Sequence, residues 1–103
     1  MASNPDFVTY ICEQLDGLGA VRSRKMFGEY MVYVNDKPLL LVCDNTVFVK
    51  MLPEVQELMN GAETGYPYDG AKLHYILDID NSYLSNKVIS ILETVTPVPK
   101  KKR

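Results

Sequence analysis

Three cations that lie close together, Arg22, Arg24 and Lys25, have the residue types and spacing best suited to binding chemistry in this chain. Guanidinium and ammonium groups bind phosphates and carboxylates, so the cluster could hold an anionic group. Neighbouring side chains of an extended strand point to opposite faces, which would separate Arg24 from Lys25. We favour an internal ion pair of Arg24 with Glu29 or Asp44 over a contact with a partner, because most surface charges carry no special role.

The residues that usually carry catalysis or bind metals are few and widely spaced. The chain has one histidine, His74, and two cysteines, Cys12 and Cys43, with no CxxC pair and no nucleophile, phosphate-loop or dinucleotide motif. A cysteine–histidine pair would require Cys12 or Cys43 to reach His74, and a lone strand histidine is more often structural. We expect both cysteines to be reduced, buried and small apolar residues. The sequence therefore predicts no enzyme, no cofactor and no metal site.

Two carboxylates, Asp78 and Asp80, flank Ile79 where a strand should pass into the last helix. Such a pair could bind a metal or act as a general base. Asp80 or Asn81 could instead cap the helix, since acids and asparagine suit the positive end of a helix dipole. We favour capping.

Seven tyrosines are present, and two of them enclose a proline in the segment Tyr66-Pro67-Tyr68, between Gly65 and Gly70. Exposed loop aromatics often form interfaces, because they bury much area at low entropic cost. The same residues could fold over the core as a lid, and we leave both readings open. An alternative function uses Tyr66, Tyr68 and His74 as a small-ligand site or an enzyme, which predicts one deep pocket containing all three.

The charge is unevenly distributed along the chain. The net charge is −2, but the last four residues carry +4, so the first 99 residues hold seven cations against 13 acids. An acidic body opposes broad nucleic-acid binding, which needs cations gathered on one face. Nucleic-acid binding through Arg22, Arg24, Lys25, Lys50 and the basic tail is kept as an alternative. We expect residues 1–97 to form the domain and residues 98–103 a basic disordered tail.

Hydrophobic periodicity predicts an α+β domain: an antiparallel sheet of about five strands with three helices, in the order α-β-β-β-(β)-α-β-(β)-α. Asn4 should cap the first helix and Gly17 should end it. Turns are expected at residues 35–37 and 44–45, and Gly28 should bend the chain between the first two strands. The expected segments are a helix over 4–17, strands within 21–50, a helix over 53–60, a loop over 61–71, a strand over 72–79 and a helix over 80–95.

Several expected strands are apolar on both faces, and "YMVYV" is the clearest of them. Either helices cover both faces of the sheet or a second copy of the chain covers one, so we predict a homodimer. No signal peptide is evident, because acids interrupt the N-terminal segment, and the apolar run "PLLLVC" is too short to span a membrane. We therefore expect a cytoplasmic protein without membrane association.

The segment "RKMFGEYMVYVNDKPLLLVCDNTVFVK" resembles the TfoX/Sxy N-terminal domain family. The pattern consists of Arg24–Gly28, Tyr30, a strand that ends in Tyr-x-Asn/Asp-x-Lys at residues 33–37, and a strand that closes at Lys50. The resemblance implies an α+β fold similar to type III secretion chaperones, which are often dimeric. It also implies a role in regulating natural competence, where full-length members act as coactivators with the cyclic AMP receptor protein.

Full-length members carry a second, helical domain, and this chain ends at Arg103 without it, so we expect a stand-alone N-terminal domain. The leading interpretation is a non-enzymatic binding module that contacts a protein partner such as a transcription factor. The candidates for that contact are basic or aromatic residues of the predicted strands and of the tyrosine loop, namely Arg22, Arg24, Lys25, Tyr30, Lys50, Tyr66 and Tyr68.

Overall fold

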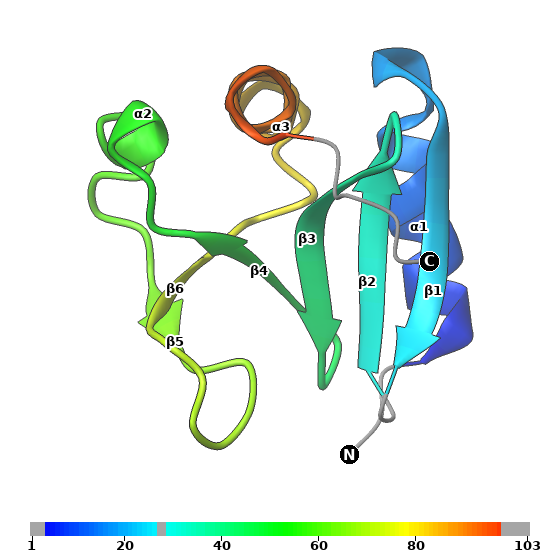
Figure 1. Ribbon diagram of the computed structural model, residues 1–103, viewed down its shortest axis with the longest axis horizontal. Coiled ribbons are helices and arrows are strands. Elements are labelled where there is room, and N and C mark those ends of the chain that lie inside the picture. Colours follow the sequence, from blue (N-terminus) through cyan, green and yellow to red (C-terminus); the bar gives the residue numbers. More distant parts are fainter. Residues whose placement is uncertain (1–3, 27–28, 98–103) are drawn as a thin grey trace.

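In the described residues, the fold is an open antiparallel sheet of six strands with three α-helices and one short 3₁₀ helix. The computed structural model describes residues 4–26 and 29–97, with strand order β1-β2-β3-β4-β6-β5 (Figure 1). This confirms the predicted α+β class. The elements are α1 (Pro5–Gln14), η1 (Asp16–Leu18), β1 (Val21–Met26), β2 (Glu29–Val34), β3 (Lys37–Cys43), β4 (Thr46–Lys50), α2 (Pro53–Gln56), β5 (Thr64–Gly65), β6 (His74–Ile76) and α3 (Ser82–Val95).

The sheet has six strands where about five were expected. The additional strand, β5, lies inside residues 61–71, which were predicted to be a loop, and pairs with β6 through Thr64 and Gly65. A two-residue strand is too short to produce a periodic signal, so only the tertiary pairing reveals it. β6 and α2 are also shorter than predicted. The bend predicted at Gly28 lies outside the described residues.

The two turns of the β2–β3–β4 meander have the predicted chemistry. Asn35 and Asp36 have φ values of 54° and 66°, and Asp44 and Asn45 have values of 53° and 57°. Two successive left-handed residues form the tight hairpin turn that matches strand twist, and asparagine and aspartate adopt it more readily than other non-glycine residues. Both asparagines also bind another element: Asn35 Oδ1 accepts from the Ala20 amide at 3.0 Å, and Asn45 Oδ1 accepts from the Asn4 amide at 2.7 Å.

The N-termini of α1 and α3 are capped by asparagine. Asn4 Oδ1 accepts from the Asp6 amide at 2.8 Å, and Asn81 Oδ1 accepts from the Leu84 amide at 3.2 Å. The predicted end of the first helix at Gly17 is wrong, because α1 ends at Gln14 and continues into η1. The left-handed region is instead occupied at Gly19, with φ 149°, where an added Cβ would lie 2.6 Å from Asn35 Oδ1.

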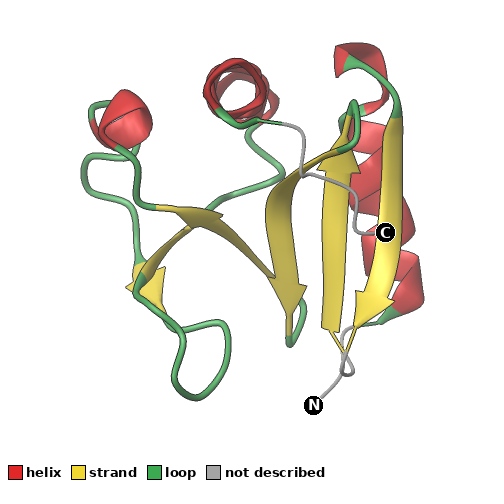
Figure 2. Cartoon of the chain, viewed as in Figure 1, coloured by secondary structure: helices red, strands yellow, loops and turns green. Residues whose placement is uncertain are grey.

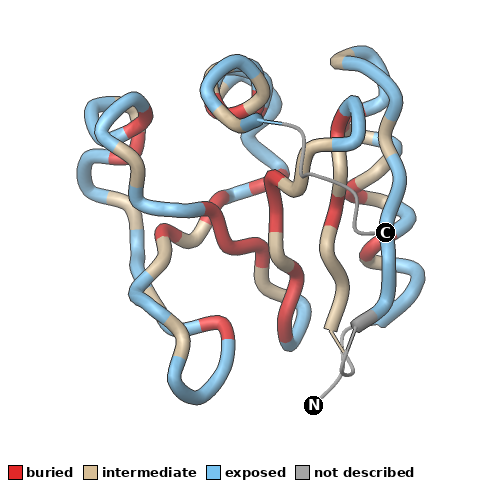
Figure 3. The backbone as a smooth tube through the Cα atoms, in the orientation of Figure 1, coloured by how far each residue is buried: buried red, intermediate tan, exposed pale blue. Residues whose placement is uncertain are grey.

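The core lies between one face of the sheet and the helices α1 and α3 (Figure 2). Figure 3 shows that buried segments of the backbone lie along β3 and β4. Alternating strand residues face this core, and each of them is at most 2% exposed: Val32, Val34, Leu40, Val42, Val47 and Val49. Helices therefore cover one face of the sheet, and the apolar residues on its other face are covered less completely.

The β2–β3 hairpin is fastened to the last turns of α3. Lys37 Nζ lies 3.1 Å from Glu93 Oε2 and donates to the Glu93 carbonyl at 2.6 Å. Asn35 Nδ2 donates to the same carboxylate at 3.4 Å. The hydrogen bonds from Lys37 and Asn35 lower the pKa of the Glu93 carboxyl. We call Asn35, Lys37 and Glu93 the hairpin clamp.

Candidate functional site

The sheet divides the cation cluster between its two faces. Across the β1–β2 pair, Arg24 is opposite Met31 and Lys25 is opposite Tyr30. Tyr30 packs against the core on the helix side, as does its strand neighbour Val32, so Lys25 is on that side as well. Arg24 is on the other side. Arg24 and Lys25 are therefore on opposite faces of the sheet, as predicted. A single anion on one face cannot contact all three cations of the cluster.

Arg22 is held by interactions within the chain. Its guanidinium carbon lies 4.1 Å from the centroid of the Tyr33 ring, and its Nε lies 3.4 Å from Asp36 Oδ1. Both charged side chains are more than half exposed. Such exposed pairs contribute little stability, but they orient the arginine along the sheet.

Arg24 has no such anchor. Neither Arg24 nor Lys25 has a hydrogen-bond or ion-pair partner in residues 4–26 and 29–97, so the internal pair that we favoured with Glu29 or Asp44 is not formed there. The Glu29 carboxylate instead lies beside the Cys43 thiol and helps to raise the pKa of that thiol. Arg24 is therefore an exposed, unpaired guanidinium within the described chain.

A row of side chains crosses the sheet on the side away from the helices. The pairings place Arg24 opposite Met31, Met31 opposite Leu41, Leu41 opposite Phe48, and Phe48 opposite Ile76. We call this row the open face. Met31, Leu41 and Ile76 are half-buried, and Phe48 is 7% exposed. The open face is thus apolar over four strands and ends at the unpaired Arg24 on the edge strand.

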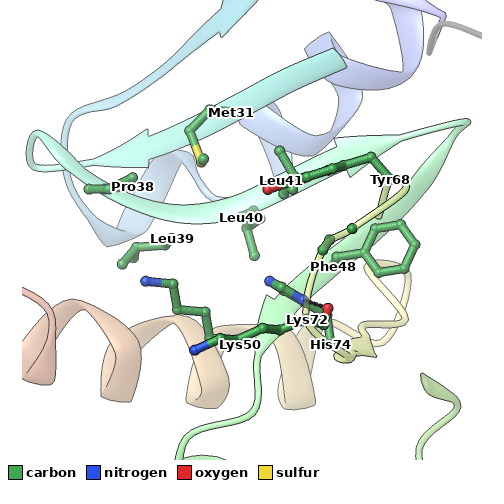
Figure 4. Close-up of a pocket in the computed structure, with 12 residues that line it drawn as sticks. Met31, Pro38, Leu39, Leu40, Leu41, Phe48, Lys50, Tyr68, Lys72 and His74 are labelled. Atoms are coloured by element: carbon green, nitrogen blue, oxygen red, sulfur yellow. Dashed lines mark hydrogen bonds between the residues drawn. The ribbon is translucent and has the colours of Figure 1, made fainter. Parts of the chain in front are cut away.

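The tyrosine loop borders this face. Tyr66 and Tyr68 are 65% and 57% exposed, while Pro67 between them is buried. The loop is therefore anchored by its proline, and both tyrosine rings are largely exposed to solvent. Tyr68 lines a pocket together with Leu41 and Phe48 of the sheet (Figure 4).

A pocket of about 380 Å³ lies between this loop and the open face. Tyr68 and His74 line it, as the alternative ligand-binding interpretation required, but Tyr66 does not. Its floor comes from β3 and β4, and Lys50 and Lys72 lie at one end (Figure 4). Lys72 and the apolar floor were missed by the sequence analysis. The alternation of β3 and β4 could have indicated the floor, but the position of Lys72 depends on the path of a loop.

His74 is oriented by two contacts. Its Nδ1 lies 2.7 Å from the Lys72 carbonyl oxygen, and its ring meets the Phe48 ring edge-on with centroids 6.4 Å apart. A carbonyl oxygen can only accept, so Nδ1 carries the proton and Nε2 is left for another partner. The backbone contact supports the expected structural role of His74.

The carboxylates before α3 also have structural partners. Asp78 Oδ1 accepts from the Asp80 amide at 3.1 Å, and Asp80 accepts from the Tyr10 hydroxyl, which ties α1 to the start of α3. That hydrogen bond raises the pKa of Tyr10. Of the two residues proposed as the cap of α3, Asn81 has that role. Among residues 4–26 and 29–97, no group of three or more potential metal ligands occurs.

Both cysteines are free, and Cys43 is buried. Burial, together with the neighbouring Glu29 carboxylate, raises the pKa of Cys43 to about 12. Burial also raises the pKa of the Cys12 thiol. Each thiol is therefore protonated at neutral pH and is a poor nucleophile.

Fold and site together define an α+β domain with helices on one face of its sheet and a partly apolar open face on the other. A family model of the TfoX N-terminal domain matches residues 13–87, and the chain belongs to this regulatory-type domain family. An uncharacterized 12.7 kDa protein in the trpE 5′ region of Spirochaeta aurantia is 28% identical over 105 residues. That alignment covers 100% of this chain and 91% of the relative. In the described residues, no helix is long and apolar enough to cross a membrane.

Proposed function

We propose that this chain is a non-enzymatic regulatory module that acts in the cytoplasm by contact with a protein, in transcriptional regulation of the competence type. Membership of the TfoX N-terminal domain family supports the regulatory role. The proposed partner is a transcription factor, as the resemblance to competence coactivators implies.

One observation carries the proposed contact, namely the open face that runs from Arg24 to Ile76. Its centre is apolar at Met31, Leu41 and Phe48, and its margin is charged and aromatic at Arg24 and Tyr68. Protein interfaces commonly have an apolar centre within a polar rim, with arginine and tyrosine enriched among the residues that contribute most binding energy. Of the residues predicted for the contact, Arg24, Lys50 and Tyr68 border this face, whereas Lys25 and Tyr30 are on the helix side.

The experiment that tests this contact is affinity capture from the native cell with quantitative mass spectrometry. The baits are the wild-type chain, Arg24→Ala, Arg24→Lys and Met31→Asp. We expect a transcription factor that is lost with Met31→Asp and reduced several-fold with Arg24→Ala, because the first change buries a charge and the second removes a rim contact. If the partner presents a carboxylate, Arg24→Lys should also weaken capture, since lysine cannot form the paired contact.

Lys25→Ala is the matched control, because it removes one cation from the same strand on the opposite side of the sheet. It should capture the partner as well as the wild-type chain. A partner retained equally by Met31→Asp and Arg24→Ala would exclude the open face as the contact. Recovery of nucleic acid, with an affinity that falls steeply as salt is raised, would instead favour the nucleic-acid alternative.

The same face supports the homodimer that the sequence predicts. A second copy of the chain would bury the apolar centre in the absence of the partner, since water contact with this surface is unfavourable. The partner would then displace the second copy from the face that both use.

A further inference from the structure

The pocket beside the tyrosine loop differs in charge from the rest of the molecule. The first 99 residues hold 13 acids and seven cations, yet the twelve residues that line the pocket include two lysines and no acid. Lys50 and Lys72 are both exposed and, in the part of the chain that the structure describes, neither has an ion-pair partner. An anion would therefore meet a local positive potential here on an otherwise acidic body.

The remaining lining is mostly apolar. Met31, Leu41 and Phe48 of the open face contribute to it, and Tyr68 forms a wall above them. The volume of about 380 Å³ lies at the lower end of the range of about 300–1,000 Å³ that is typical of small-molecule sites. A compact apolar body fits such a floor, and a large polar one does not.

The cationic residues of the pocket lie at one end, apart from its apolar floor. Lys50 is directly opposite His74 across the β4–β6 pair, and the carbonyl of Lys72 binds His74 Nδ1, so these three residues gather at one end. In Figure 4 both lysine side chains extend to that end, away from Tyr68. The proton on Nδ1 leaves Nε2 of His74 without a hydrogen-bond partner among the described residues.

We propose that this pocket binds a small amphipathic anion, a molecule with a single carboxylate and a compact apolar body. The carboxylate lies between Lys50 and Lys72, and the apolar body lies on Leu41 and Phe48 beneath Tyr68. Ammonium groups bind as point charges and demand no forked geometry, so a monocarboxylate suffices. The pocket shares Met31, Leu41 and Phe48 with the open face, so a protein bound to that face would compete with this ligand.

The test uses the purified full-length chain and three probes of equal chain length: octanoate, 1-octanol and octylammonium. Titration is followed by amide chemical shifts in two-dimensional NMR. We expect octanoate to saturate with a dissociation constant on the order of a millimolar, as its size allows. The shifts should be confined to residues 31, 39–41, 48–50 and 68–74. Octanol should bind several-fold more weakly, and octylammonium should not saturate.

Lys50→Ala combined with Lys72→Ala should weaken octanoate binding by about tenfold, because each partly exposed charge contributes a factor of about two to five. Added salt should weaken binding to the wild-type chain in the same direction. The matched control combines Lys25→Ala with Lys87→Ala, which removes two cations that do not line the pocket. This control should bind octanoate as the wild-type chain does. All four positions are exposed, so both double variants should fold.

Equal binding of octanoate and octanol would overturn the proposal, as would an unchanged affinity in the Lys50 and Lys72 double variant. Shifts that spread over α1 and α3, or a lack of saturation at tens of millimolar octanoate, would also overturn it. The titration is run below the concentration at which the chain dimerises, so that neither a protein partner nor a second copy covers the pocket residues of the open face. Failure here would therefore leave the proposed protein contact standing, and loss of that contact in cells would leave the pocket standing.

Discussion

At the scale of single residues, Cys43 shows how a small apolar position can also bury a reactive group. Cys43 is 2% exposed and lies beside the Glu29 carboxylate, whose Oε1 is buried with no hydrogen-bond partner among the described residues. Ionising the thiol would place a second negative charge beside the first in a region with little water, which explains why its pKa is raised.

We predict that Cys43 reacts with iodoacetamide about a thousandfold more slowly than a free thiol at pH 8, because a pKa of about 12 leaves very little thiolate. The measurement is the alkylation rate by mass spectrometry in a Cys12→Ser background. Glu29→Gln should accelerate the reaction only partly, since burial is the larger cause. Denaturant should restore the ordinary rate. Alkylation of native Cys43 at the rate of glutathione would contradict this account.

The face of the sheet on which Arg24 lies could be predicted from the sequence, but its partner could not. Strand alternation separated Arg24 from Lys25 correctly, because the two-residue period of a strand is a property of the backbone. The favoured partners of Arg24 could not be tested by alternation, since an ion pair depends on where other strands bring their carboxylates. Glu29 lies in the next strand but turns to Cys43, and Asp44 lies in the exposed β3–β4 turn.

At the scale of elements, the hairpin clamp gives a structural meaning to part of the sequence pattern. Asn35 and Lys37 belong to the Tyr-x-Asn/Asp-x-Lys ending that carries the family resemblance, and both contact Glu93 of α3. Sequence reasoning could recognise the turn, because asparagine and aspartate suit left-handed backbone angles. It could not identify Glu93 as the partner, since the contact joins residues 56 positions apart.

Lys37→Met should lower the melting temperature by a few degrees at pH 7. At pH 3 the melting temperatures of the variant and the wild-type chain should differ by less. The pKa of Glu93 is lowered in the folded state. The ionised carboxylate therefore stabilises the fold at pH values above the pKa of the unfolded state, and this stabilisation is lost as the pH falls through the pKa of the folded state. The hydrogen bond from Lys37 to the Glu93 carbonyl does not titrate, so some difference should persist.

The measurement is thermal unfolding followed by circular dichroism at both pH values. Lys87→Met is the matched control, because this lysine of α3 contacts the Tyr83 ring and no carboxylate is paired with it in the described residues. Its effect should be the same at pH 3 and pH 7. An effect of Lys37→Met that grows as the pH falls would reverse the sign of the proposed linkage.

At the scale of the whole molecule, the sheet is asymmetric, because helices cover one of its faces and leave the other partly open. The sequence analysis recognised strands that are apolar on both faces, and it identified the α+β class and the order of most elements from periodicity, caps and turns. It could not decide what covers each face, because helix packing is set by the three-dimensional path of α1 and α3. The two-residue strand β5 and the pocket wall were likewise fixed by tertiary contacts.

We predict that the isolated chain is a homodimer in which the open face is buried, and that Leu41→Asp makes it a monomer. A charge at the centre of an apolar interface is left without a partner, which weakens association by at least tenfold. Multi-angle light scattering at high protein concentration measures the mass. Tyr83→Asp is the control, because this tyrosine of α3 is 73% exposed and lies on a different element.

The control should remain a dimer, and circular dichroism should show both variants folded. A wild-type chain that is monomeric at the highest concentration reached would rule out the homodimer. A dimer that survives Leu41→Asp would place the contact on another surface.

The two asparagine turns have a consequence for how this chain folds. Glycine would also fit the left-handed backbone, but it has no side chain to hold Ala20 or Asn4, so Asn35 and Asn45 combine the turn with a bond to a distant segment. Each turn asparagine accepts its hydrogen bond only when the segment that contains Asn4 or Ala20 has packed beside the hairpin. Such a chain gains little from forming one hairpin alone, which favours a cooperative, all-or-none transition in which the meander and the helices order together.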